Sequence, residues 1–241
     1  MANGRRRFAQ GAWAPTPAVL GLLVTLLVLQ LLYGFSANFI PGIAVVFEKM
    51  VLTTGGVLDG EVWRVASYGL LHSLMNPMHL VFNGIVLFFF GRDLETRWGA
   101  WRFLLFVLLG VVAGGLAVVG SKVLGIGTGN AVGISGACEA LVVCWALFNR
   151  EREVYLFFLA PVKGIWLIAF ALLMWMLDAV SVSEISAAAH FGGMVFGALA
   201  WLVVARQNRL RLAWDDLLVL LKLRKKPRLT IVPKGPDRWV H

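Results

Sequence analysis

The chain has 241 residues, of which 59% are hydrophobic and only 15% charged, and its mean hydropathy is +0.80. A soluble domain usually has an apolar fraction of about 45–50%, so this composition argues against an ordinary soluble protein. The net charge of +9 would suit a nucleic-acid-binding protein, but the basic residues crowd the two ends while the middle is apolar. This distribution favours a membrane protein with cationic flanks.

A membrane-spanning helix needs about 20 mostly apolar residues, and the sequence predicts an all-α bundle of six such spans. In chain order they are Ala18 to Phe35, Leu74 to Phe90, Phe103 to Val119, Ala131 to Phe148, Gly164 to Val180 and Ile185 to Ala205. The first could instead be a cleaved signal peptide. Its long apolar stretch ends without a clear small-residue cleavage site, which favours a retained span.

The charges of the connections predict the orientation of the spans. If six spans alternate, most arginines and lysines lie on one side, including Arg5 to Arg7, Arg92, Arg97, Arg150 and Arg152. The positive-inside rule then makes both termini cytoplasmic. The predicted parts are a basic N-terminus (1–17), a six-span domain (18–205) and a basic tail (206–241).

Two segments outside the spans have their own predicted roles. The longest connection, Ser36 to Ser73, is apolar enough to fold against the bundle or to dip into the membrane interface. The tail contains AWDDLLVLLKLRKK, which predicts a short amphipathic helix on the anionic cytoplasmic leaflet. This leaflet contact explains the basic run without a nucleic-acid partner.

The first candidate catalytic residue is Ser135, in the sequence Gly133-Ile134-Ser135-Gly136 near the non-cytoplasmic mouth of the fourth span. Glycines allow a tight turn and close approach, and the free N–H groups of a helix start can stabilise negative charge. A single G-x-S-G also occurs wherever membrane helices pack through small residues. Chemistry at this serine needs a neighbouring base.

The sixth span supplies a candidate base, His190. Gly193 and Gly197 follow it at spacings that place all three residues on one helix face, and glycines let that face approach another helix. His190 lies early in a span that runs inward, so it matches the predicted depth of Ser135. The alternative is a histidine that only bridges two helices.

The second span supplies candidate hydrogen-bond donors for an oxyanion. His79 and Asn83 are four residues apart and therefore share a helix face, and imidazole and amide N–H groups are suitable donors. A structural pair is the alternative. A metal site built from His72, His79, Glu139 and His190 is also conceivable, but no HExxH-type spacing supports it. Cys138 and Cys144 share one apolar segment, which argues against disulfides or a four-ligand zinc site.

Together these motifs resemble the rhomboid family of intramembrane serine proteases. The resemblance covers most of the chain and includes Trp63-Arg64, the H-x-x-x-N of His79 and Asn83, and the E-x-R-x-G of Glu95, Arg97 and Gly99. It also includes the G-x-S-G around Ser135 and the H-x-x-G-x-x-x-G of His190, Gly193 and Gly197. It implies a cofactor-free Ser135–His190 dyad that cleaves membrane-protein segments, with His79, Asn83 and the Ser135 backbone N–H holding the oxyanion.

Two departures from the family pattern concern His72 and Glu139. Relatives often have a histidine five residues before the one matching His79, whereas His72 is seven before it. Relatives commonly have an aromatic residue where Glu139 stands, one turn after the serine. We hypothesise that Glu139 orients the His190 ring as a third catalytic group. The competing hypothesis is that Glu139 contributes nothing to turnover.

The expected protein is therefore a six-span serine endopeptidase, and the compact frame suggests a bacterial inner membrane. The rival is a rhomboid-like pseudoprotease that binds transmembrane helices without cutting them. The presence of both Ser135 and His190 favours the enzyme. A transporter is disfavoured because no internal repeat or paired broken helices are evident.

Overall fold

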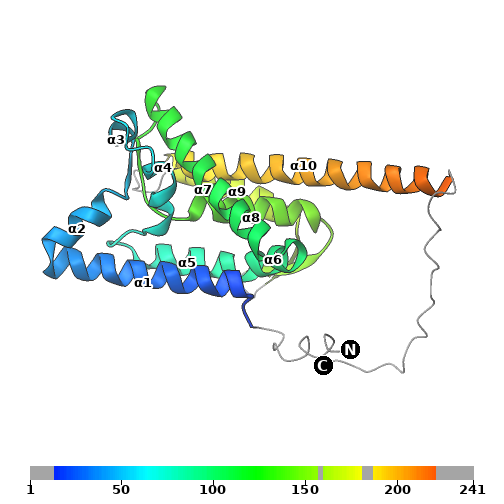
Figure 1. Cartoon of the computed structure of the whole chain (residues 1–241), viewed down its shortest axis with the longest axis horizontal. Coiled ribbons are helices and arrows are strands. Elements are labelled where there is room, and N and C mark those ends of the chain that lie inside the picture. The colour runs from blue at the N-terminus through cyan, green and yellow to red at the C-terminus, as the bar shows by residue number, and fades with distance from the viewer. Residues whose placement is uncertain (1–13, 157–159, 181–186, 221–241) are drawn as a thin grey trace. The chain divides into compact units, whose positions relative to one another are not determined.

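The computed structural model describes residues 14–156, 160–180 and 187–220 and shows a mostly helical protein (Figure 1). The larger helices are α1 (Pro17–Phe39), α2 (Pro41–Glu48), α5 (Pro77–Val86), α6 (Arg92–Trp98), α7 (Ala100–Val123), α8 (Ser135–Phe148), α9 (Trp166–Val180) and α10 (Ala187–Leu220). Short helical elements are α3 (Thr54–Leu58), α4 (Arg64–Ser67), the 3-10 helix η1 (Tyr68–Leu70) and the π-helical turn η2 (Leu87–Gly91). The strands β1 (Leu52–Thr53) and β2 (Asn130–Ala131) pair with each other, as do β3 (Glu153–Leu156) and β4 (Ala160–Lys163); both pairs are antiparallel.

Three helices among the described residues are long and apolar enough to cross a membrane: α1, α7 and Ala187–Gln207 of α10. They correspond to the first, third and sixth predicted spans. Helices α8 and α9 are apolar but shorter, and the second predicted span falls on α5 and η2. The number six therefore stays a prediction.

The predicted starts of the second and fourth spans were too early. Residues Leu74 to Asn76 precede α5, which has Pro77 in its first turn, where the missing N–H costs nothing. Ala131 belongs to β2, opposite Leu52, and α8 begins only at Ser135. Gly133 has a φ of +111°, which is incompatible with a helix, and thereby places the helix start at the serine.

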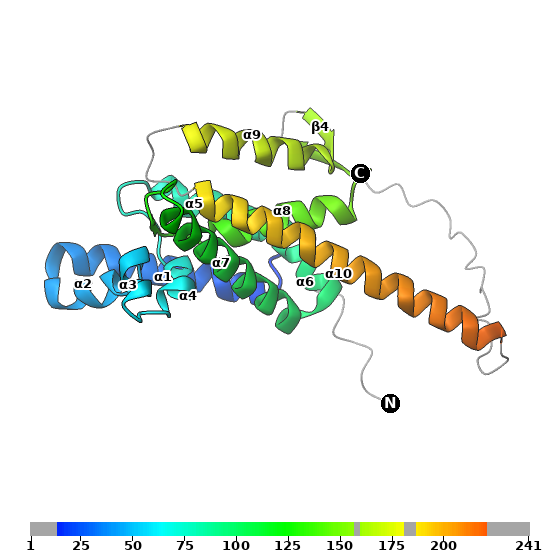
Figure 2. The same cartoon turned by 90° about the horizontal axis from the view of Figure 1, so that it is seen from above.

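The long connection folds against the bundle, which is the first of the two arrangements predicted for it. The Tyr68 side chain is fully buried and its hydroxyl donates a hydrogen bond to the Val111 carbonyl of α7. Trp63 and Arg64 hold the connection together, because the Trp63 indole donates to the Lys49 carbonyl while Arg64 binds Glu61 and the Glu48 carbonyl. Figures 1 and 2 show α3 and α4 beside one end of α7.

The helices α7, α8 and α10 pack through glycines. A Cβ at Gly110 of α7 would lie 3.0 Å from the Ala137 Cα of α8, and one at Gly197 of α10 would lie 2.5 Å from the Ala140 carbonyl oxygen. A Cβ at Gly193 would overlap the Gly136 carbonyl oxygen. The predicted close approach at Gly193 and Gly197 is therefore present, and its partner is α8.

Helix α1 is attached to α6 by a buried carboxylate. Glu95 accepts hydrogen bonds from the Ala18 and Val19 N–H groups and from the Thr16 hydroxyl. These N–H groups belong to the first turn of α1 and have no partner within the helix, and a negative charge there also complements the helix dipole. Gly99, with a φ of +83°, then turns the chain from α6 into α7.

The chain divides into two units, the first ending at Trp201 and the second beginning at Leu202. Helix α10 continues without a break to Leu220, so the described part of the predicted tail helix extends the sixth helix. The basic run from Lys222 onward, the N-terminal Arg5 to Arg7 and the predicted start of the sixth span at Ile185 lie outside the described residues.

Candidate active site

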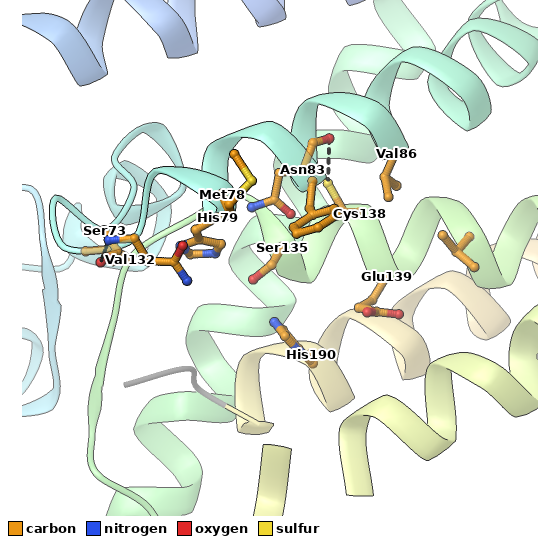
Figure 3. Close-up of a pocket in the computed structure, with 13 residues that line it drawn as sticks. Ser73, Met78, His79, Asn83, Val86, Val132, Ser135, Cys138, Glu139 and His190 are labelled. Atoms are coloured by element: carbon orange, nitrogen blue, oxygen red, sulfur yellow. Dashed lines mark hydrogen bonds between the residues drawn. The ribbon is translucent and has the colours of Figure 1, made fainter. Parts of the chain in front are cut away.

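A cavity of about 540 Å³ lies between α5, α8 and the start of α10, within the first unit. Its lining includes five of the predicted site residues: His79, Asn83, Ser135, Glu139 and His190 (Figure 3). These residues come from three helices that are far apart in the sequence. The tertiary structure therefore brings together the side chains that the motifs selected.

Ser135 is the first residue of α8. The turn before it is shaped by Gly133, whose N–H donates to the Tyr68 carbonyl of the long connection at 3.0 Å. Figure 3 shows the Ser135 hydroxyl and a nitrogen of the His190 ring directed towards each other. In the first turn of α8 the Ala137 and Cys138 N–H groups donate to the Ile134 carbonyl. The Ser135 and Gly136 N–H groups come before the first possible bond within the helix, so these two are available to a ligand beside the serine.

Gly133 also makes room for His79. A Cβ at Gly133 would lie 2.6 Å from His79 Cε1 and 2.8 Å from Nε2, so the imidazole occupies the space that any other residue would fill. The predicted role of this glycine in close approach thus has a definite neighbour. Gly136, on the other side of the serine, faces Gly114 of α7 and the Ala189 carbonyl.

Asn83 lies one turn after His79 on α5 and is 6% exposed. Its Nδ2 atom is buried and has no hydrogen-bond partner among the described residues. Its backbone carbonyl accepts a hydrogen bond from the Cys138 thiol at 3.6 Å, which joins α5 to α8 (Figure 3). Burying an unpaired amide is costly, so this donor is suited to a ligand in the cavity.

His190 is anchored by a residue that the sequence motifs did not select. Its Nδ1 atom lies 3.1 Å from Oδ2 of Asp178, on α9. Its other nitrogen, Nε2, is buried and has no partner among the described residues. The imidazole therefore has one nitrogen held by a carboxylate and one left for chemistry on the cavity side.

Glu139 lies one turn after Ser135 and lines the same cavity. Its Oε2 atom is buried without a partner in the described part of the chain. Our hypothesis gives Glu139 the role of orienting the His190 ring, but in the structure the carboxylate at Nδ1 of that ring is Asp178. The catalytic contribution of Glu139 stays a prediction.

His72 lies in the connection before α5, outside the predicted spans. It is fully buried, and its ring packs edge-on against His79 with centroids 5.1 Å apart. The pKa of His72 is lowered to about 3, mainly by burial and to a smaller extent by the nearby charge of His79. This ring is therefore neutral near pH 7. No cluster of metal-ligating side chains occurs in the described residues.

The sequence contained a signal for Asp178 that the motif search missed. It is the only ionisable residue in the fifth predicted span, GIWLIAFALLMWMLDAV, and an isolated carboxylate within an apolar span indicates function by default. Its partner could not be inferred from spacing, because helix geometry relates residues only within one helix.

A family model described as the Rhomboid domain matches residues 59–207, which is more than half of the chain. The chain therefore belongs to the rhomboid family, as its motifs predicted. The match and the apolar helices identify an integral membrane protein. Rhomboids are usually intramembrane serine proteases, although inactive members exist. Comparison with curated proteins gave no match.

Proposed function

We propose that this rhomboid is an active serine endopeptidase that cleaves membrane proteins within or beside their transmembrane segments. The observation that carries the proposal is the cavity beside Ser135, which is lined by three side chains with a buried polar atom that is unpaired within the described part of the chain: Asn83, Glu139 and His190. Two of these atoms matter for the proposal. The His190 Nε2 and Asn83 Nδ2 atoms are both buried without a partner among the described residues. Buried polar atoms are rarely left unpaired, and here one suits a base and the other an oxyanion donor.

The chemistry would follow from this arrangement. Ser135 Oγ forms a bond to the scissile carbonyl carbon while its proton passes to His190 Nε2. The carbonyl oxygen becomes an oxyanion held by Asn83 Nδ2, His79 and the Ser135 backbone N–H. The C–N bond then breaks as His190 returns the proton to the leaving amine. Water, with His190 again as base, hydrolyses the resulting ester and restores the serine.

The expected substrates are single-span or polytopic membrane proteins. A transmembrane helix hides its carbonyls in hydrogen bonds, so a substrate helix must unwind locally, and small or helix-destabilising residues near the cleavage point favour this. We further propose six spans, a bacterial inner membrane, and cytoplasmic termini with the basic tail on the anionic leaflet. No cofactor or nucleic acid is needed in this scheme.

The test is a cleavage assay in liposomes with a single-span substrate that carries small residues at its outer edge. We expect Ser135→Ala and His190→Ala each to lower kcat/KM by about 10⁴-fold or more. Ser121→Ala is the matched control, because within the described part of the chain the Ser121 hydroxyl bonds only to the Val118 carbonyl of its own helix. A fluorophosphonate probe run in parallel should label the wild type and not Ser135→Ala.

The outcomes separate the two classes of function. Cleavage that is lost in both site variants and kept in Ser121→Ala supports the protease. The pseudoprotease would be established instead if folded wild-type protein neither reacts with the probe nor cuts any substrate, yet still binds the transmembrane helices of other membrane proteins.

A further inference from the structure

We propose that Asp178 is a positioning residue for His190, so that Ser135, His190 and Asp178 act together as a triad. The inference rests on the proposed function, because it assigns a role in the same proton transfer. It starts from the 3.1 Å contact between Asp178 Oδ2 and His190 Nδ1. Both side chains are largely enclosed, with exposed fractions of 23% and 13%, so water competes weakly for this contact.

Helix α9 holds the start of α10 at two points on one face. Trp175 lies one turn before Asp178, and its indole donates a hydrogen bond to the Ala187 carbonyl at 3.0 Å. Its ring also packs against Phe191, with centroids 5.1 Å apart. Residues three apart share a helix face. Trp175 thus positions the backbone around His190, while Asp178 positions the imidazole itself.

The carboxylate decides which nitrogen of His190 can accept a proton. A neutral imidazole carries one N–H, and the nitrogen that bonds to a carboxylate must be the donor. Asp178 therefore places the proton on Nδ1 and leaves Nε2 as the base that faces the cavity. When Nε2 takes the proton of Ser135, the same carboxylate stabilises the imidazolium that forms. No bond to Asp178 is made or broken in this sequence.

Other titratable groups near His190 do not replace this role. His79 of α5 and Glu139 of α8 line the same cavity, and both interact electrostatically with His190. Among the described residues, however, Nδ1 is bonded to Asp178. Glu139 Oε2 and His190 Nε2 each lack a partner, so these two atoms do not bond to each other.

The first experiment is kinetic. Asp178→Asn keeps the shape of the side chain but offers an N–H, which favours the wrong tautomer of His190. We expect kcat to fall by about 10²- to 10⁴-fold with KM nearly unchanged, and Asp178→Glu to recover part of the loss. Asp93→Asn is the matched control, since Asp93 binds the Trp145 indole and Arg152 away from the cavity. Glu139→Gln is measured in the same series.

The second experiment is independent of turnover, and its first measurement uses no Asp178 variant. Histidine ¹⁵N NMR of Ser135→Ala protein in bilayers reports the tautomer directly, and the His190 signal is assigned by its loss in an added His190→Gln change. We expect a protonated Nδ1 and an unprotonated Nε2. Adding Asp178→Asn should move the proton to Nε2.

The results distinguish the possible failures. The inference is overturned if Asp178→Asn keeps kcat within about threefold of wild type, if Glu139→Gln removes activity while Asp178→Asn does not, or if His190 is protonated at Nε2 in the parent. If the parent protein has the expected tautomer but no wild-type cleavage occurs, the placement of Asp178 stands and the proposed protease activity fails.

Discussion

Helices α8 and α9 have similar lengths and similarly apolar sequences, but the protein holds them in different ways. Nine residues of α8 are buried, whereas only Leu167 and Ala171 of α9 are. The middle of α9 exposes Leu173, Met176 and Leu177 by half or more. Figure 2 shows α9 at the edge of the bundle, beyond α8.

The difference indicates two ways of placing a functional side chain. Ser135 is placed by backbone packing, because α8 meets α7 and α10 through glycines that admit no side chain. Such contacts are rigid, since a close-packed interior resists displacement. The face of α9 near His190 is placed by polar and aromatic contacts from Asp178 and Trp175. His190 therefore lies between a rigid helix and a lightly packed one.

Helix α1 extends the comparison, because it resembles α9. Its buried residues are Val19, Leu26 and Ser36, and the carboxylate of Glu95 ties its first turn to α6. In a lipid environment apolar burial between helices contributes little, so packing and hydrogen bonds must hold them together. A carboxylate thus contributes a contact to each of the two lightly packed helices, and at α9 the Trp175 contacts are added to it.

The largest effect on stability is expected where glycine packing is closest. Gly193→Ala would direct a methyl group into the Gly136 carbonyl oxygen. Because this oxygen belongs to the backbone, the clash can be relieved only if α10 moves away from α8. We expect a loss of about 3 kcal/mol in the free energy of unfolding, measured by thermal or denaturant unfolding in detergent.

The control for this change is Gly21→Ala in α1, where the added Cβ has no neighbour within 4 Å. Alanine is the better helix former, so this variant should be as stable as wild type or slightly more stable. Equal effects at Gly193 and Gly21 would contradict the distinction between α8 and the lightly packed helices.

A smaller loss of unfolding free energy is expected at Glu95, whose carboxylate binds the first turn of α1. Glu95→Ala leaves the first-turn N–H groups of Ala18 and Val19 without their buried acceptor, and we expect a loss of about 2 kcal/mol. Thr96→Ala on the same helix is the matched control, because the one bond of the Thr96 hydroxyl to a described residue is to the Arg92 carbonyl. This variant should change stability by less than about 0.5 kcal/mol. If both variants unfold alike, α1 is held by packing after all.

The smallest effect is a pH dependence from His72, which is buried where the connection meets α1. The backbone N–H of His72 donates to the Gln30 side chain, whereas the ring nitrogens have no partner among the described residues. Its pKa falls from 6.5 to about 3 on folding, so the unfolded chain binds an extra proton below about pH 6.5. Stability must therefore decrease as the pH falls from 6.5 towards 3.

His72→Leu removes this site. We expect the stability lost between pH 7.5 and pH 5.5 to be about 1 kcal/mol smaller in the variant than in wild type. The measurement is the unfolding midpoint at both pH values, in protein that also carries Ser135→Ala to prevent self-cleavage. Parallel pH profiles would show that His72 is accessible to protons in the folded protein.

The sequence predicted the class of this protein well because its signals are local or additive. Apolar runs require no knowledge of neighbours, and the spacing of His190, Gly193 and Gly197 predicts one close-packing face from helix geometry alone. The motifs around Ser135, His79 and Asn83 likewise predicted the family that the domain match confirmed. The span boundaries were less accurate, because the start of α8 depends on Ala131 pairing with Leu52, about eighty residues away.

The sequence by itself determined that this is a helical rhomboid membrane protein with a serine and a histidine at similar predicted depth. Only the tertiary structure decided which carboxylate contacts that histidine. Glu139 shares a helix face with Ser135 and was the natural choice from spacing, whereas Asp178 lies on another helix. A hydrogen bond depends on distance and direction in space, and the relative placement of α9 and α10 is set by their packing and not by any periodicity along the chain.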